Sequence, residues 1–117
     1  MASNRLNRIN EEVRRELSDL IRQLKDPRIN SMVTVMSAEV TSDQRWCKVY
    51  VSVFDESSRK EVMKGLRSAA GYLRRELGSR VRMRSTPELI FVEDESIKKG
   101  ARIAALLNEL EEKTDGQ

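Results

Sequence analysis

The stretch GLRSAAGYLRRELG, residues 65–78, carries the pattern that decides the fold. Its apolar positions, with Val62 just before it, recur at steps of three and four, as one face of a helix requires, and the stripe comprises Val62, Leu66, Ala69, Leu73 and Leu77. Gly71 interrupts this helix, although a mid-helix glycine costs roughly 1 kcal/mol relative to alanine. We therefore predict two helices that share one apolar face and bend at Ala69-Ala70-Gly71. A glycine that permits close packing of two elements is the alternative, and both can hold together.

The flanking residues predict where these helices begin and end. SRKE at 58–61 has the spacing of a capping box, with Ser58 as N-cap and Glu61 reaching back to it. Gly78 is placed to end the second helix. Residues 80–93 then read as a strand, bent at Pro87, because Val81 and Met83 alternate with arginines.

The remaining segments complete an α+β pattern. Residues 4–25 have helical periodicity, 32–41 and 46–54 read as a β-hairpin, and 96–112 as a last helix whose start is capped by the acids at 93–95. The predicted order is α-β-β-α-(kink)-α-β-α, a three-stranded sheet covered by helices. We expect one domain over residues 1–112 and a disordered tail at 113–117.

Positive charge is concentrated in one part of the chain. Residues 59–84 hold nine Lys or Arg against two Asp or Glu, whereas residues 1–58 balance at nine each and residues 85–117 hold four against eight. Such a cluster is expected of a protein that meets a polyanion, and arginine suits phosphate oxygens. A solvated face is the alternative. The candidate RNA-binding side chains are Lys60, Lys64, Arg67, Arg74, Arg75, Arg80, Arg82 and Arg84, the last three on one strand face.

The basic residues of the first helix are read differently. Arg15 lies four residues after Glu11 and four before Asp19, a spacing typical of stabilising pairs within a helix. Most basic residues of the first helix are therefore interpreted as structural. The secondary RNA-binding candidates are Arg5, Arg8, Arg45 and Lys48.

The residues available exclude most enzyme chemistry. The chain has one cysteine and no histidine, which excludes disulfides, Cys/His zinc sites and histidine-assisted nucleophiles. Cys47 shares a strand face with valines and reads as a small buried hydrophobe. Trp46 and Tyr50, on the opposite face, could stack bases, but core or boundary packing is favoured. The acidic run at 93–95 reads as helix capping rather than a metal site. We predict no enzyme, no metal and no cofactor, and, from the lack of a long apolar run, a cytoplasmic chain without membrane contact.

Over nearly its whole length the chain resembles the ribosome-binding factor A family of bacterial small-subunit maturation factors. The resemblance rests on Ala69-Ala70-Gly71, which matches the family's Ala-x-Gly kink, on PEL at 87–89, and on the element order. It implies a type II KH fold that binds the free small ribosomal subunit during late maturation and processing of its rRNA. It also implies RNA contact at Ala69 and Gly71, a role in cold adaptation and release by an assembly GTPase. A monomer is expected.

The missing GxxG loop has a physical consequence. In ordinary KH domains that loop clamps about four backbone nucleotides, so a kink with fewer free amides should clamp single strands poorly. Affinity should then come from basic side chains on the phosphates of structured RNA. Two alternatives stay open: a general structured-RNA chaperone, and a protein-binding module without a ribosomal address.

Overall fold

The computed structural model describes residues 2–29 and 33–94. In chain order, its elements are α1 (Ala2–Arg22), β1 (Val33–Val40), β2 (Trp46–Val53), the 3-10 turn η1 (Glu56–Ser58), α2 (Arg59–Ser68), α3 (Ala70–Arg80) and β3 (Glu88–Glu93). The predicted α+β class and the order of these elements are confirmed. The helix predicted at 96–112 and the tail at 113–117 lie outside the described residues.

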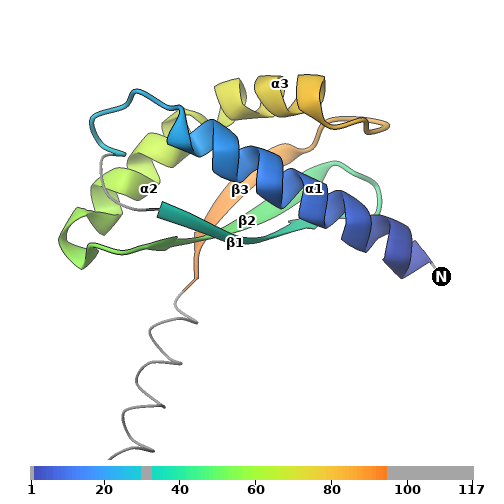
Figure 1. The fold of residues 1–117 in the computed structure, drawn as a ribbon, viewed down its shortest axis with the longest axis horizontal. Coiled ribbons are helices and arrows are strands. Elements are labelled where there is room, and N and C mark those ends of the chain that lie inside the picture. The colour runs from blue at the N-terminus through green and yellow to red at the C-terminus, as the bar shows by residue number, and fades with distance from the viewer. Residues whose placement is uncertain (1, 30–32, 95–117) are drawn as a thin grey trace, which may run out of the picture.

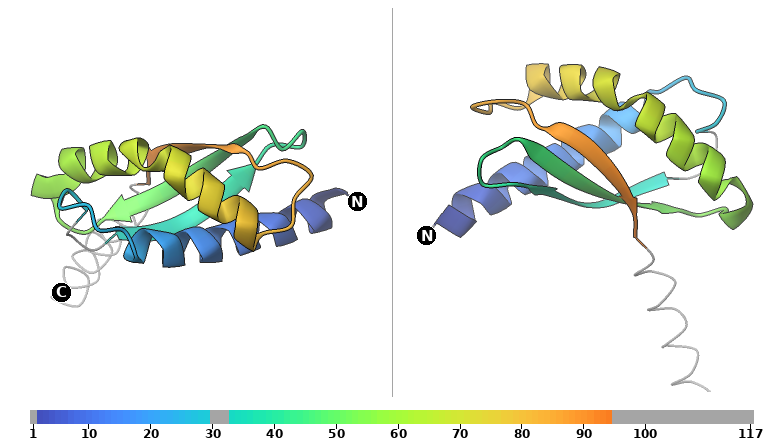
Figure 2. Two further views of the ribbon diagram at one scale, coloured as in Figure 1. Left: turned by 90° about the horizontal axis from the view of Figure 1, so that it is seen from above. Right: turned by 180° about the vertical axis from the view of Figure 1, so that it is seen from behind.

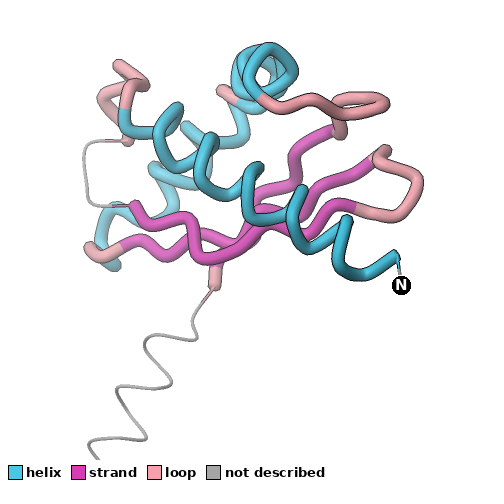
Figure 3. Tube along the Cα trace, turned by 45° about the vertical axis from the view of Figure 1, so that its right-hand side comes forward, coloured by secondary structure: helices cyan, strands magenta, loops and turns pink. Residues whose placement is uncertain are grey.

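The molecule has two layers, with α1, α2 and α3 on one face of a three-stranded sheet (Figures 1 and 3). Strand order is β1-β2-β3. The predicted hairpin is present, since β1 and β2 are antiparallel, with an irregularity between Val35 and Ser37. β2 and β3 are parallel and need a crossover, which α2 and α3 provide.

The core lies between the helices and the sheet. Cys47, Val49, Val51 and Val53 all face it from β2 and are at most 3% exposed, as strict alternation along a strand predicts. Together with Leu17 of α1, which is fully buried, they belong to one continuous cluster of buried side chains. This shared core holds α1, α2 and α3 on the same side of the sheet.

The opposite sheet face carries polar and aromatic side chains. Trp46 is 45% exposed and Ile90 39% exposed, so the core or boundary packing predicted for Trp46 is wrong. Tyr50 is half-buried, in keeping with a boundary position, and its hydroxyl donates to the Glu39 carboxylate at 3.3 Å. Among the described elements, the helices cover only the other face of the sheet.

The strand predicted for 80–93 is wrong over its first half. α3 continues through Arg80, residues 81–87 form a loop, and β3 begins at Glu88, directly after Pro87. The alternation at 80–84 resembles that of a strand. In the structure Val81 is buried at the end of α3, and its amide donates to the Leu77 carbonyl, which closes the helix. Proline lacks the amide that a ladder needs, so it suits the residue before the strand.

The paired helices and their shared stripe are confirmed. Val62, Leu66, Leu73 and Leu77 are fully buried, and Ala69 packs half-buried beside them. The break falls at Ala69, whose φ of −85° and ψ of −3° depart from helical values.

Three local predictions around these helices are wrong. Gly71 lies inside α3 rather than at the break, and Gly78 also lies inside α3 rather than ending it. No described glycine has a positive φ. Ser58 is the N-cap of α2 but makes no side-chain capping bond, because η1 continues into the helix and Asp55 caps that turn instead.

Candidate nucleic-acid interface

Three candidate side chains line up on α2. Lys60, Lys64 and Arg67 fall at steps of four and three, so they share one helix face, and all three are exposed. We call them the α2 basic face. The ion pair found for them among the described residues is a long one, 3.8 Å from Lys64 Nζ to Glu61 Oε1. Such exposed pairs contribute little, so this charge stays available to a partner.

The α2 basic face borders a shallow hollow of about 310 Å³ that extends to the end of β3. Arg59 and Met63 complete its α2 wall, and Glu93 forms the opposite side. Glu93 is held by Arg59, with Nε 3.1 Å from Oε2. This acid therefore serves a structural pair, and the hollow keeps an excess of positive charge.

The neighbouring arginines of α3 have different roles. Arg75 is exposed, and no hydrogen bond or ion pair is found for it within residues 2–29 and 33–94. Arg74 donates to the Thr86 carbonyl from Nε at 3.1 Å and from Nη2 at 3.0 Å. It also lies 3.8 Å from the Glu88 carboxylate. Arg74 thus fastens the 81–87 loop to α3, whereas Arg75 has no partner found among the described residues.

The prediction that Arg80 shares a strand face with Arg82 and Arg84 is wrong. Arg80 is the last helical residue of α3, and its Nη1 donates to Asp19 at 2.8 Å and to Glu16 at 3.1 Å on α1. The bond from Arg80 is the main reason that the pKa of Asp19 is lowered. The sequence places these residues 61 and 64 positions apart, so their pairing follows only from the packing of α3 on α1.

Three other arginines lie on loops beyond the C-terminal end of α3. Arg82 and Arg84 are exposed on the 81–87 loop, and Arg45 is exposed on the β1–β2 turn. We call them the loop arginines. They do not form the single strand face that was predicted, since residues 81–87 are irregular. In Figure 2 the turn and the loop lie together, beyond the end of α3 that is distant from α2.

Gln44 connects the two loops. It is the only non-glycine residue with positive φ among those described, at 58°. Its Oε1 accepts hydrogen bonds from the amides of Arg84 (3.1 Å) and Ser85 (3.4 Å), and its carbonyl accepts from Ser85 Oγ at 3.2 Å. Backbone strain at Gln44 thus accompanies contacts that hold the loop arginines near one another.

The kink separates the two groups of cations. Gly71 is exposed, and a Cβ built on it would meet nothing within 4 Å. Gly65 differs, because its added Cβ would lie 2.8 Å from Ile29 Cγ1 and 3.3 Å from the Arg28 Cβ. Gly65 is therefore the packing glycine, which lets the segment after α1 approach α2. Gly71 leaves an open surface at the kink.

The secondary candidates are scattered. Arg5 and Arg8 are exposed near the start of α1, and Lys48 is exposed on the open sheet face. The i,i+4 pairs predicted for Arg15 are wrong, because Glu11 bonds to Arg14 instead, with Arg14 Nε 3.1 Å from its carboxylate. Arg15 is left as an exposed cation distant from the α2 basic face in the sequence.

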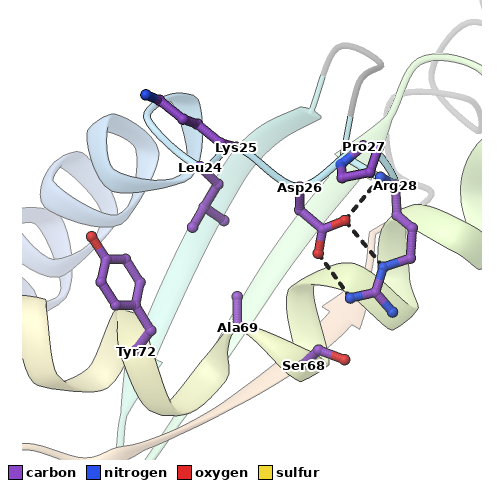
Figure 4. A pocket seen from close by; sticks show the side chains of 8 residues that line it. All are labelled: Leu24, Lys25, Asp26, Pro27, Arg28, Ser68, Ala69 and Tyr72. Carbon is purple, nitrogen blue, oxygen red and sulfur yellow. Dashed lines mark hydrogen bonds and ion pairs between the residues drawn. The ribbon is translucent and has the colours of Figure 1, made fainter.

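Sequence reasoning missed a hollow at the kink, lined in part by Tyr72 and Lys25 (Figure 4). One signal was present in the opening stretch. Tyr72 falls outside the apolar stripe that runs through Leu66, Ala69 and Leu73, so it had to point away from the core. It is 49% exposed.

Taken together, the candidate site consists of two groups of exposed cations, with the kink and its exposed Gly71 between them in the chain. Arginine and lysine side chains separated in this way can neutralise phosphates on different parts of a structured RNA. Among the described residues, no three His, Cys, Asp or Glu side chains come together to hold a metal ion.

Comparison with known proteins places this geometry in a family. The family described as Ribosome-binding factor A matches residues 5–107. Ribosome-binding factor A of Clostridium perfringens (strain SM101 / Type A) is 53% identical over 116 residues, covering 97% of this chain and 100% of that protein. The Clostridium tetani (strain Massachusetts / E88) protein of the same name is 50% identical, covering 98% and 97% respectively.

Solved structures agree with these sequences. The crystal structure of ribosome-binding factor A from Thermus thermophilus superposes with a TM-score of 0.69 at 31% identity, covering 75% of this chain and 94% of that one. A Thermus thermophilus homology model fitted into the cryo-EM map of a 30S complex gives a TM-score of 0.59 at 30% identity, covering 74% and 91%. The family match over residues 5–107 and relatives about 50% identical over nearly the whole chain lead to one conclusion: this chain belongs to the ribosome-binding factor A family.

Proposed function

We propose that this chain binds the free small ribosomal subunit and assists late maturation and processing of its rRNA. The observation that carries the proposal is the α2 basic face, which presents three exposed cations beside an open kink. Support comes from the family and from the relative that was fitted into a 30S complex.

Binding would proceed through phosphates rather than through base sequence. The α2 basic face, Arg75 and the loop arginines would contact rRNA phosphates, with Ala69 and Gly71 at the surface between them. Arg74 and Arg80 would act indirectly, because their guanidinium groups hold the 81–87 loop and α1. A protein that binds one rRNA conformation more tightly than another shifts the population toward it.

The residue types of the chain agree with a binding role without catalysis. The chain has no histidine. Its one thiol is fully buried, and burial raises the pKa of Cys47 to about 12.

No described helix is long and apolar enough to cross a lipid bilayer. A cytoplasmic place beside ribosomes, a monomeric state and release by a GTPase stay predictions.

Sedimentation with purified particles tests the proposal. The chain is mixed with free small subunits, immature small-subunit precursors, large subunits and translating ribosomes, each with and without excess structured competitor RNA. We expect it to travel with free small subunits and precursors despite the competitor. Equal binding to every RNA would support the general chaperone instead, and binding that survives high salt would support the protein-binding module.

A further inference from the structure

A second hollow lies on the side of the kink that faces α1. It has a volume of about 660 Å³, within the range of small-ligand sites. One wall is the segment 24–28, directly after α1, and the other is the kink, with Ser68, Ala69 and Tyr72 (Figure 4). The α2 basic face and the loop arginines contribute no residue to it.

The interior of this hollow is apolar and includes one aromatic ring. Leu24 and Ala69 are half-buried and pack against the core cluster. Tyr72 lies beside them, with about half of its surface exposed. An exposed ring next to aliphatic side chains offers a stacking surface for a nucleobase, which every base can use because each has a π face.

The rim of the hollow is positively charged. Asp26 accepts three hydrogen bonds from Arg28: from its amide at 2.9 Å, from Nε at 3.1 Å and from Nη2 at 2.8 Å. The acid is therefore neutralised by its neighbour, and its pKa is lowered as a result. Lys25 is exposed at the rim and projects outward in Figure 4. Arg28 is engaged by Asp26 and lies on the side away from Tyr72 in Figure 4, so Lys25 is the rim cation for which no acidic partner is found among the described residues.

We propose that this hollow takes one unpaired nucleotide of the RNA that the chain binds, with its base on Tyr72 and its phosphate beside Lys25. The inference rests on the proposed function. An apolar floor below a cationic rim suits a nucleotide, which has a flat base and an anionic phosphate. A free anion would leave the floor unused, and an apolar protein side chain would leave the cations unused. The open surface at Gly71 leaves room for the RNA backbone to approach the same kink.

The test compares Tyr72→Ala with Tyr72→Phe and with Phe54→Ala in the full chain. Phe54 is 82% exposed on the segment after β2 and outside the hollow, so it is a matched exposed aromatic. Binding is measured to purified small subunits and to protein-free small-subunit rRNA. Loss of one stacked base should weaken binding by roughly five- to a hundredfold for Tyr72→Ala. Tyr72→Phe keeps the ring and should keep most of the affinity, and Phe54→Ala should bind like the unsubstituted chain.

Two further measurements separate stacking from charge and from unfolding. The salt dependence of Tyr72→Ala should keep its slope, because stacking releases no counterions, whereas Lys25→Gln should lower the slope by about one unit. Urea melts should show that each variant stays folded.

Two outcomes would overturn the assignment. One is undiminished binding by Tyr72→Ala, and the other is a loss seen with intact subunits but absent with protein-free rRNA, which would place a ribosomal protein in the hollow. Failure of the unsubstituted chain to bind small subunits would instead refute the proposed function.

Discussion

Arg80 at the end of α3 donates a hydrogen bond to Asp19 of α1, with Nη1 2.8 Å from Oδ2. The same nitrogen reaches Glu16 at 3.1 Å. The bond joins α3 to α1, so a residue that reads as RNA-binding in the sequence has a structural partner in the fold.

The first prediction concerns this pair. Arg80→Ala and Asp19→Asn should each lower the urea midpoint, and the double variant should lose less than the sum of the two, because both single changes break the same bond. Small-subunit affinity of folded Arg80→Ala should stay close to that of the unsubstituted chain. Additive losses of stability would show that the two side chains do not interact in solution.

The second prediction follows the lowered pKa of Asp19. The folded state favours the carboxylate, so the stabilisation is fully present above the ordinary aspartate pKa of 3.8 and is lost as pH falls through the lower folded value. Urea midpoints measured from about pH 6 to pH 2 should therefore fall less steeply for Asp19→Asn than for the unsubstituted chain. Identical pH profiles would contradict the lowered pKa.

Much of the fold follows from the sequence because the pattern repeats over several turns or residues. The stripe from Val62 to Leu77 and the alternation from Cys47 to Val53 each leave one consistent face to bury. The start of β3 could not be placed in this way. Val81 and Met83 satisfy both a helix end and a strand, and only tertiary contacts such as the Arg74 bond to Thr86 decide between them.

The candidate site was predictable as a charge excess but not as a surface. Lys60, Lys64 and Arg67 share a face because helical spacing requires it. The sequence could not show that Arg74 and Arg80 have partners while Arg75 has none found among the described residues, because those partners lie 12 to 64 positions away in the chain. The sequence predicts the bend at Gly71, but in the structure Ala69 has the non-helical ψ. The glycine that permits close packing is Gly65.

The third prediction uses these two glycines as a matched pair. Gly71→Ala should raise stability by up to about 1 kcal/mol, since its Cβ meets nothing and its φ is not positive. Its small-subunit affinity should fall several-fold if rRNA lies against the kink. Gly65→Ala should instead lose about 1 to 3 kcal/mol, because Ile29 must move.

Urea melts and subunit pull-downs on the same two variants provide the measurement. A Gly71→Ala chain that is more stable and binds normally would exclude the kink surface from the interface. A Gly65→Ala chain as stable as its parent would show that the segment after α1 yields easily.

The fourth prediction is that Cys47 is unreactive while the chain is folded. It is fully buried, and burial raises the pKa of its thiol to about 12, so almost no thiolate exists at pH 8. A disulfide reagent should label it at pH 8 only in denaturant, and the labelling rate should rise along the urea unfolding curve. Rapid labelling of the native chain would mean that β2 opens locally.

The central claim is that the α2 basic face binds rRNA phosphates, and one measurement tests it most directly. Small-subunit affinity is determined against salt concentration for the double variant Lys64→Gln/Arg67→Gln, with Arg15→Gln/Arg22→Gln as the control of equal charge change on α1. The account predicts that the log-log slope falls by about two units for the α2 variant, with weaker binding, and changes little for the control. Equal slopes and equal affinities for the two variants would contradict it.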